Sequence, residues 1–177
     1  MTQKVRIRQA RLQDAAAISH MMNELGYPIK TAVVERKLSD SHDDADNAVL
    51  VAVVKGSTVG VLSVHALPLL HAEGMFATIT SLFVAPDYRR QGIGSQLLAH
   101  AESFAYRFGC IGINVASAHR RADAHAFYQA QGFTPDAVNT YFRKEMKTNP
   151  DGGLTLMSIK SSSATTAPHA PAVIRTM

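Results

Sequence analysis

Residues 89–95 combine two basic side chains with two glycines, a grouping that could bind a polyanion. Arg89, Gly92 and Gly94 form an Arg-x-x-Gly-x-Gly pattern between an apolar run that stops at Pro86 and a helix-like run that follows. The first N–H groups of a helix have no intrahelical partner, and the macrodipole adds roughly half a positive charge there. Glycine lets a diphosphate approach the backbone without meeting a Cβ. The segment therefore predicts an anion site at a strand–loop–helix junction.

Two common nucleotide-binding motifs are excluded at this position. A Walker-type P-loop needs Gly-x-x-x-x-Gly-Lys-Ser/Thr, and the sequence contains no such segment. The dinucleotide fingerprint needs a third glycine three residues after Gly94, where this chain has Leu97. The predicted anion site therefore belongs to another class of phosphate-binding loop.

The spacing of apolar residues predicts alternating strands and helices around this loop. Strands are expected over 4–9, 48–54, 59–66, 79–84, 111–115 and 141–146, and helices over 12–25, 31–38, 93–108 and 121–130. Lys55 to Thr58 is typical of a hairpin turn, and Asp40 to Asp46 of an acidic loop. Hairpins in the first half and β-α-β units in the second predict an α/β (α+β) fold, with a mixed sheet covered by helices on both faces.

The composition of the 177 residues, 46% hydrophobic and 18% charged, is typical of one globular domain. The net charge is +4, but no basic run exceeds two residues, which disfavours nucleic acid as a partner.

Cys110 is the only cysteine, so an intrachain disulfide is excluded. No run approaches 18 apolar residues, and we expect no signal peptide, no membrane span and a cytoplasmic protein.

We place the domain in residues 1–147 and expect residues 148–177 to form a disordered C-terminal tail. Residues 149–153 read Asn-Pro-Asp-Gly-Gly and break regular structure. The remainder is rich in Ser, Thr and Pro and has no sustained apolar period, although Leu154 to Ile159 could add a strand or dock on a neighbour.

A second block, Phe127-Tyr128-x-x-x-Gly132-Phe133, lies about 35 residues after the glycine loop, at the end of a predicted helix. The two blocks, in this order and on these elements, resemble the GNAT superfamily of acyl-CoA N-acetyltransferases over about residues 5–146. The resemblance implies a mostly antiparallel central sheet with one splayed parallel pair of strands, here those of 79–84 and 111–115. It also implies acetyl-CoA as cosubstrate and no metal.

The resemblance assigns roles to particular residues. Tyr128 is expected to donate a proton to the leaving thiolate, although it could instead only pack beside Phe127. The contacts to acetyl-CoA are expected from Leu82, Phe83, Val84, Arg89, Arg90, Gln91, Gly92, Ile93, Gly94, Ser95 and Arg121. Many relatives have an asparagine where this chain has Arg121, which could reach the adenosine phosphate or lie in solvent at the start of the helix.

The sequence departs from the family at the general base. Many relatives carry a glutamate on the strand before the glycine loop, where this chain has Thr78 and Thr80. An alkylamine has a pKa near 10.4 and must lose a proton before it attacks a thioester. The candidates for that proton acceptor are Glu73, His65, His71 and His119, or a chain of water molecules.

The acceptor is expected to be a primary amine on a small molecule, received over Leu25 to Thr31 with Tyr27 and Thr80 as contacts. The acidic run Asp40 to Asp46 could attract a cationic amine or could be a solvated loop. Three alternatives stay open: a protein N-acetyltransferase, a non-catalytic module that binds or senses acyl-CoA, and an interaction domain without a cofactor. A homodimer is expected only by analogy with relatives.

Overall fold

The structure is a computed structural model that describes residues 4–42, 44–136 and 144. The predicted strand 141–146, apart from Lys144, and the predicted tail 148–177 lie outside the described residues, as does the expected boundary at residue 147. The elements in chain order are β1 (Val5–Gln9), a 3-10 turn η1 (Leu12–Asp14), α1 (Ala15–Leu25), α2 (Thr31–His42), β2 (Asn47–Val54), β3 (Ser57–Pro68), β4 (Met75–Val84), η2 (Pro86–Tyr88), α3 (Ile93–Arg107), β5 (Cys110–Val115) and α4 (Ala122–Ala130).

The strands form one sheet in the order β1-β2-β3-β4-β5. The first three pairings are antiparallel, and β4 and β5 pair in parallel, so the predicted mixed sheet is confirmed. The turn between β2 and β3 is Lys55-Gly56, with φ of 49° and 85°. Two consecutive positive φ values are typical of a type I′ turn, whose twist matches that of the flanking strands.

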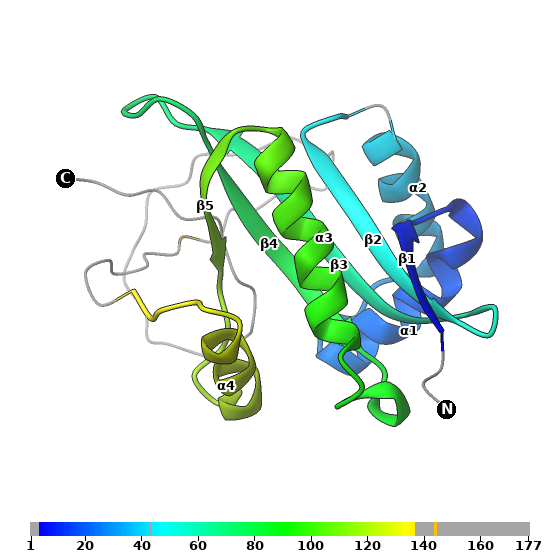
Figure 1. Cartoon of the computed structure of the whole chain (residues 1–177). Helices are drawn as coiled ribbons and strands as arrows, with labels where there is room; N and C mark the ends of the chain where they lie inside the picture. Colours follow the sequence, from blue (N-terminus) through cyan, green and yellow to red (C-terminus); the bar gives the residue numbers. More distant parts are fainter. Residues whose placement is uncertain (1–3, 43, 137–143, 145–177) are drawn as a thin grey trace, which may run out of the picture.

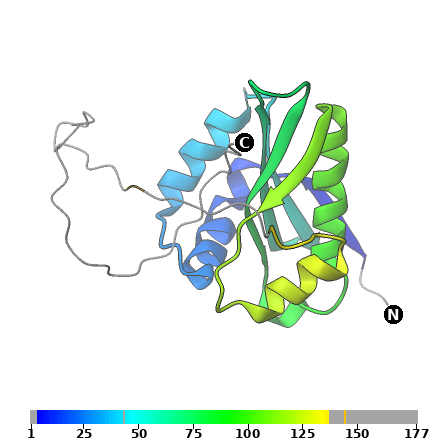
Figure 2. The same ribbon diagram turned by 90° about the vertical axis from the view of Figure 1, so that its left-hand side faces the viewer.

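Helices cover both faces of the sheet, as predicted (Figures 1 and 2). On one face, α3 buries Ile93, Leu97, Leu98, Ala101, Phe104 and Ala105, the three-and-four spacing seen in the sequence. On the other face, α1 and α2 pack against Val51, Val61 and Phe83 of the three central strands. Full burial of a side chain such as Leu97 or Leu98 contributes roughly 1.5–3 kcal/mol to the free energy of unfolding. This packing fixes α3 on the sheet and thereby fixes the position of the loop that precedes it.

Several boundaries differ from the sequence prediction. Strand β3 (Ser57–Pro68) extends beyond the expected 59–66 at both ends, so only Lys55 and Gly56 form the turn. The second helix continues through Ser39 and Asp40 to His42, so it ends four residues later than expected and includes Asp40, the first residue of the expected acidic loop. Leu38 is buried against the sheet, and this packing extends the helix past residues whose charge suggested a loop. The segment Leu12–Asp14 is a 3-10 turn, so α1 begins only at Ala15 and then ends at Gly26, whose φ is 95°.

A buried carboxylate joins the first strand to the β2–β3 hairpin. Asp14 is 4% exposed and accepts two hydrogen bonds from Arg8, at 2.7 and 2.9 Å. It also accepts bonds from the Thr58 hydroxyl at 2.6 Å and the Arg11 N–H at 2.7 Å. Burial by itself raises the pKa of Asp14, but these hydrogen bonds outweigh it and lower the pKa to about 2.

Candidate active site

The glycine loop has the backbone geometry of an anion site. Arg90 and Gly92 have φ of 60° and 76°, and Gly92 is the N-cap of α3. No side chain caps the helix, so its first-turn N–H groups are left for another acceptor. A Cβ added to Gly92 would have no atom within 4 Å, which means that the space beside this residue is open. An anion could therefore approach the helix start from this side.

The second glycine of the loop has a different surrounding. A Cβ added to Gly94 would lie 3.2 Å from Cζ and 3.3 Å from Cε2 of Phe127 on α4. These distances are tighter than ordinary van der Waals contact, so the missing side chain is what lets α4 pack on the start of α3. The two sequence blocks thus contact each other through Gly94 and Phe127.

The side chains of Arg89 and Gln91 donate hydrogen bonds to backbone carbonyls just before the loop. Arg89 Nε donates to the carbonyl of Val84 at 2.9 Å, and its guanidinium lies 5.4 Å from the centre of the Phe83 ring. Gln91 Nε2 donates to the carbonyl of Asp87 at 3.1 Å. These bonds hold the loop in shape and keep positive charge at its mouth.

Strands β4 and β5 separate at the point where β4 approaches the loop. Their pairing runs from Met75 with Cys110 to Ile79 with Val115 and stops there. Beyond Ile79, no described strand pairs with this edge of β4, while β3 continues to pair with the opposite edge as far as Val84. The edge therefore offers backbone N–H and C=O groups to an extended ligand that could bind as an added strand.

A β-bulge marks the first residue past this separation. Ser63 pairs with Ser81 and Val64 with Ile79, so Thr80 is an extra residue on β4. A bulge places two consecutive side chains on the same face of a strand, and Thr80 and Ser81 both line a cavity on the face covered by α1 and α2. Sequence reasoning missed this bulge because neither glycine nor proline marks it.

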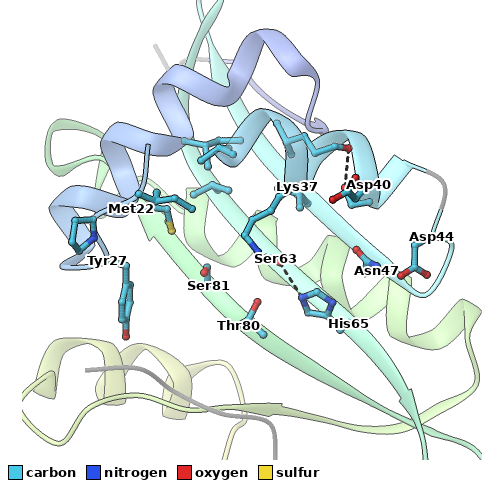
Figure 3. A pocket seen from close by; sticks show the side chains of 18 residues that line it. Met22, Tyr27, Lys37, Asp40, Asp44, Asn47, Ser63, His65, Thr80 and Ser81 are labelled. Atoms are coloured by element: carbon cyan, nitrogen blue, oxygen red, sulfur yellow. Dashed lines mark hydrogen bonds between the residues drawn. The ribbon is translucent and has the colours of Figure 1, made fainter. Parts of the chain in front are cut away.

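The cavity has a volume of about 540 Å³ and lies between α1, α2 and strands β2 to β4 (Figure 3). Tyr27 stands at the end nearest α4, and Asp40 and Asp44 stand at the other end (Figure 3). Its lining residues are Ile18, Met22, Tyr27, Pro28, Ile29, Val34, Lys37, Leu38, Asp40, Ser41, Asp44, Asn47, Val49, Val61, Ser63, His65, Thr80 and Ser81. Apolar residues and polar or charged residues contribute about equally to this lining, so it offers both contact surface and hydrogen-bonding groups to a small molecule.

The structure brings together only some of the predicted polar residues. Tyr27 and Thr80 line the cavity, and so does His65 among the candidate bases. Glu73, His71 and His119 are exposed and do not line it. Sequence reasoning did not single out Ser63, Ser81, Lys37 and Asn47. Ser63 and His65 could have been found as the two polar residues, spaced by two, in the otherwise apolar run 59–66.

Tyr128 lies among aromatic rings at the C-terminal part of α4. Its ring centre is 5.4 Å from that of Phe127 and 5.6 Å from that of Phe133. Burial raises the pKa of the Tyr128 hydroxyl to about 12, and the nearby charge of Arg121 lowers it only in part. The phenol therefore keeps its proton at neutral pH and can act as a donor.

Arg121 links the start of α4 to the joint between α1 and α2. Its Nη2 donates to the carbonyl of Leu25, the last residue of α1, at 2.6 Å. This bond directs the guanidinium toward the segment that carries Tyr27, and a contact between Arg121 and acetyl-CoA stays a prediction.

The described part of the chain shows neither a membrane-spanning helix nor a cluster of metal-binding side chains. In residues 4–42 and 44–136, no helix is long and apolar enough to cross a membrane. Within the same ranges, His, Cys, Asp and Glu side chains do not gather in a group of three that could hold a metal ion.

The sequence profile of the acetyltransferase (GNAT) family matches residues 15–133, so the chain belongs to this family. An aminoalkylphosphonate N-acetyltransferase from Salmonella typhimurium is 39% identical over 83 residues, which cover 47% of this chain and 54% of that protein. An aminoglycoside N(6')-acetyltransferase type 1 from Stenotrophomonas maltophilia is 30% identical over 146 residues, covering 80% of this chain and 94% of that protein. The chain thus spans about half the length of the first of these relatives and most of the second.

The fold is similar to that of a solved aminoglycoside N-acetyltransferase, AAC(6')-Iy in complex with CoA. The TM-score is 0.72, with 16% identity, over 81% of this chain and 97% of that one. At this identity the likeness concerns the fold alone. This similarity of fold agrees with the predicted mixed sheet, in which the parallel strands β4 and β5 separate.

Proposed function

We propose that this chain is an acetyl-CoA-dependent N-acetyltransferase that transfers the acetyl group directly to a primary amine of a small molecule. The observation that carries the proposal is the position of Thr80. This residue is the first past the last β4–β5 pair and also lines the cavity. The opening between the strands and the cavity therefore meet at one place, where a thioester from one side could contact an amine from the other.

The residues present fit the charge and shape of acetyl-CoA. The uncapped start of α3 and the open side of Gly92 suit a diphosphate, and Arg89 and Arg90 add positive charge. The edge of β4 from Thr80 to Val84 suits the amide groups of the pantetheine arm. Leu82 and Val84 would contribute through their backbone, as would the buried Phe83.

Besides binding both substrates, direct transfer requires that the protein orient them and supply a proton donor. Holding amine and thioester in contact converts an encounter of two molecules into a step within one complex, which removes much of the entropic barrier. A leaving thiolate benefits from a proton donor, and Tyr128 is the proposed donor because its hydroxyl stays protonated.

The cavity favours a small acceptor. Its volume of about 540 Å³ lies within the usual range for small-molecule sites, roughly 300–1,000 Å³. The relatives named above acetylate an aminoalkylphosphonate and an aminoglycoside, both of them small molecules with primary amines. Lys37, Asp40 and Asp44 give the lining both signs of charge, so we expect an acceptor that carries a further polar or charged group.

The test combines binding and turnover. Acetyl-CoA is titrated calorimetrically, with CoA for comparison, and 2-aminoethylphosphonate, kanamycin, spermidine and a lysine peptide are then added with thiol detection. We expect acetyl-CoA to bind, to raise the melting temperature, and to release CoA thiol only with a small amine. At 100 times its dissociation constant a ligand stabilises the folded state by roughly 2.7 kcal/mol.

Other outcomes select the alternatives. Release with the lysine peptide alone indicates a protein N-acetyltransferase, and binding without release indicates a sensing module. Absence of binding rejects the assignment of the 89–95 loop and favours an interaction domain. Gly92→Val is the matched variant for the loop, because it places a branched side chain in the open space beside the helix start.

A further inference from the structure

The proposed reaction needs a proton acceptor in the cavity, and the following inference rests on that proposed function. At neutral pH an alkylamine is almost wholly an ammonium ion, which has no lone pair for attack. The acceptor of this proton must lie beside the place where amine and thioester meet. In this chain that place is marked by Thr80 and Ser81.

Among the described side chains that line the cavity, the titratable ones are Tyr27, Lys37, Asp40, Asp44 and His65. Lys37, Asp40 and Asp44 come from α2 and the segment that follows it, on the side away from Tyr27 (Figure 3). Imidazole is the side chain whose ordinary pKa lies closest to neutrality, which makes it an efficient acceptor at physiological pH. Its ordinary pKa and its position next to Thr80 (Figure 3) therefore select His65.

The sheet register places His65 beside the bulge. His65 pairs with Thr78 across β3 and β4, and Ser63 pairs with Ser81. Residues directly opposite on two strands have Cβ atoms about 4.5–5.5 Å apart on one face. Ser63, His65, Thr80 and Ser81 consequently lie next to one another on the cavity side (Figure 3). The Ser63 Oγ is 3.4 Å from His65 Nε2, a long contact that a bound amine could tighten.

We propose that His65 accepts the proton of the bound ammonium, with Ser63 as the residue that orients the imidazole. The N–H bond of the ammonium breaks and a new N–H bond forms on His65, which leaves a neutral amine. The amine forms the C–N bond to the thioester carbonyl and the C–S bond breaks. Tyr128 gives its proton to the thiolate and regains one from the acylated nitrogen, and His65 returns its proton to solvent. The sum is ammonium plus acetyl-CoA giving amide, CoA thiol and one proton.

The surroundings of His65 keep it in the neutral form. Burial lowers the pKa of His65 below its ordinary value of 6.5, the charge of Asp44 raises it, and the charge of Lys37 lowers it. Asp40 is the other charged side chain at this end of the cavity. The neighbours on β2 and β4, Asn47, Thr78 and Thr80, are uncharged. Neutral imidazole is the form that can take a proton.

The test is the pH dependence of kcat/KM for the amine of the above panel that is turned over fastest, in wild type and His65→Gln. With the base present, kcat/KM should be level above the pKa of His65. Without it, only amine that is already neutral in solution can react, so kcat/KM should rise about tenfold per pH unit toward the amine pKa. At pH 7 the variant should be slower by about 10²-fold or more, and the gap should narrow as pH rises.

The controls separate this inference from the proposed function. His71→Gln removes an exposed histidine outside the cavity and should match wild type. Acetyl-CoA affinity should be unchanged in His65→Gln, and His65→Asn serves if the first variant folds poorly. A variant that keeps the level profile overturns the role of His65 while leaving the transferase intact. Absence of amine-dependent thiol release in wild type overturns the proposed function itself.

Discussion

Gly94 at the start of α3 and Phe127 on α4 pack against each other, at a place where a Cβ on residue 94 would approach the ring more closely than ordinary van der Waals contact. An added Cβ would lie 3.2 Å from the nearest ring carbon. The helix start that is proposed to bind a diphosphate is therefore supported by the helix that carries Tyr128. The elements proposed for diphosphate binding and for proton donation therefore contact each other through Gly94 and Phe127.

Gly94→Val should destabilise the protein by about 1–3 kcal/mol, because overpacking at a closed contact forces neighbours to shift. Adding Phe127→Leu to it should recover part of this loss, which is measurable as a coupling in a double-mutant cycle by urea denaturation. Gly92→Val should cost about 1–2 kcal/mol through its positive φ, and it should show no coupling to Phe127→Leu. Equal coupling for both glycines would contradict this distinction.

Tyr128→Phe should reduce turnover by about 10²- to 10⁴-fold if the phenol donates a proton to the thiolate. Acetyl-CoA affinity by calorimetry should change little, since only the hydroxyl is lost. Tyr106→Phe is the matched control, because Tyr106 is 87% exposed on α3. Because the pKa of Tyr128 is about 12, its hydroxyl stays protonated over the usual assay range. The pH profile of turnover should therefore show no fall below pH 10 that is caused by ionisation of Tyr128. Unchanged turnover in Tyr128→Phe removes the residue from the mechanism.

Arg121→Ala should raise KM for the acceptor several-fold while acetyl-CoA affinity stays within about twofold. The reason is that its guanidinium donates a hydrogen bond to the Leu25 carbonyl, beside the segment that carries Tyr27. A hydrogen bond from a charged donor contributes about 1.5–3 kcal/mol, so a loss of stability is also expected. Arg120→Ala changes an exposed neighbour and is the control. A large loss of acetyl-CoA affinity would instead favour the cofactor contact that the family resemblance implies.

Asp14→Asn should remove stability that depends on pH. The pKa of Asp14 is about 2 in the folded protein against 3.8 ordinarily, so the ionised form favours folding. This contribution, about 2 kcal/mol, is complete above pH 4 and is lost as the pH falls from 3.8 toward 2. Denaturation of wild type and variant between pH 2.5 and 6 should show a difference that shrinks with acid. Asp87→Asn, at an exposed residue, should show no such trend.

Local sequence signals predicted much of this fold. The Lys55-Gly56 turn, the buried stripe of α3 and the stop at Pro86 depend on neighbours in sequence, and each is present. The length of α2 was underestimated because burial of Leu38 on the sheet prevails over the charge that follows.

The site was less predictable because it depends on register. The extra residue Thr80 changes which side chains of β4 face the cavity. No glycine or proline in this stretch of sequence indicates the bulge. Likewise, a glycine in the sequence does not reveal what occupies the space of its missing side chain. Gly92 has open space there and Gly94 has Phe127, although the two stand in one motif.

Direct transfer of acetyl from acetyl-CoA to a small amine, at the junction of the cavity and the strand opening, must yield both products together. The most direct measurement counts acetylated amine by mass spectrometry and CoA thiol by absorbance in the same reaction. We expect equal amounts of both, with release dependent on the amine and reduced in Tyr128→Phe. Thiol release without acetylated amine would show hydrolysis in place of transfer, and binding with neither product would contradict the assignment as an enzyme.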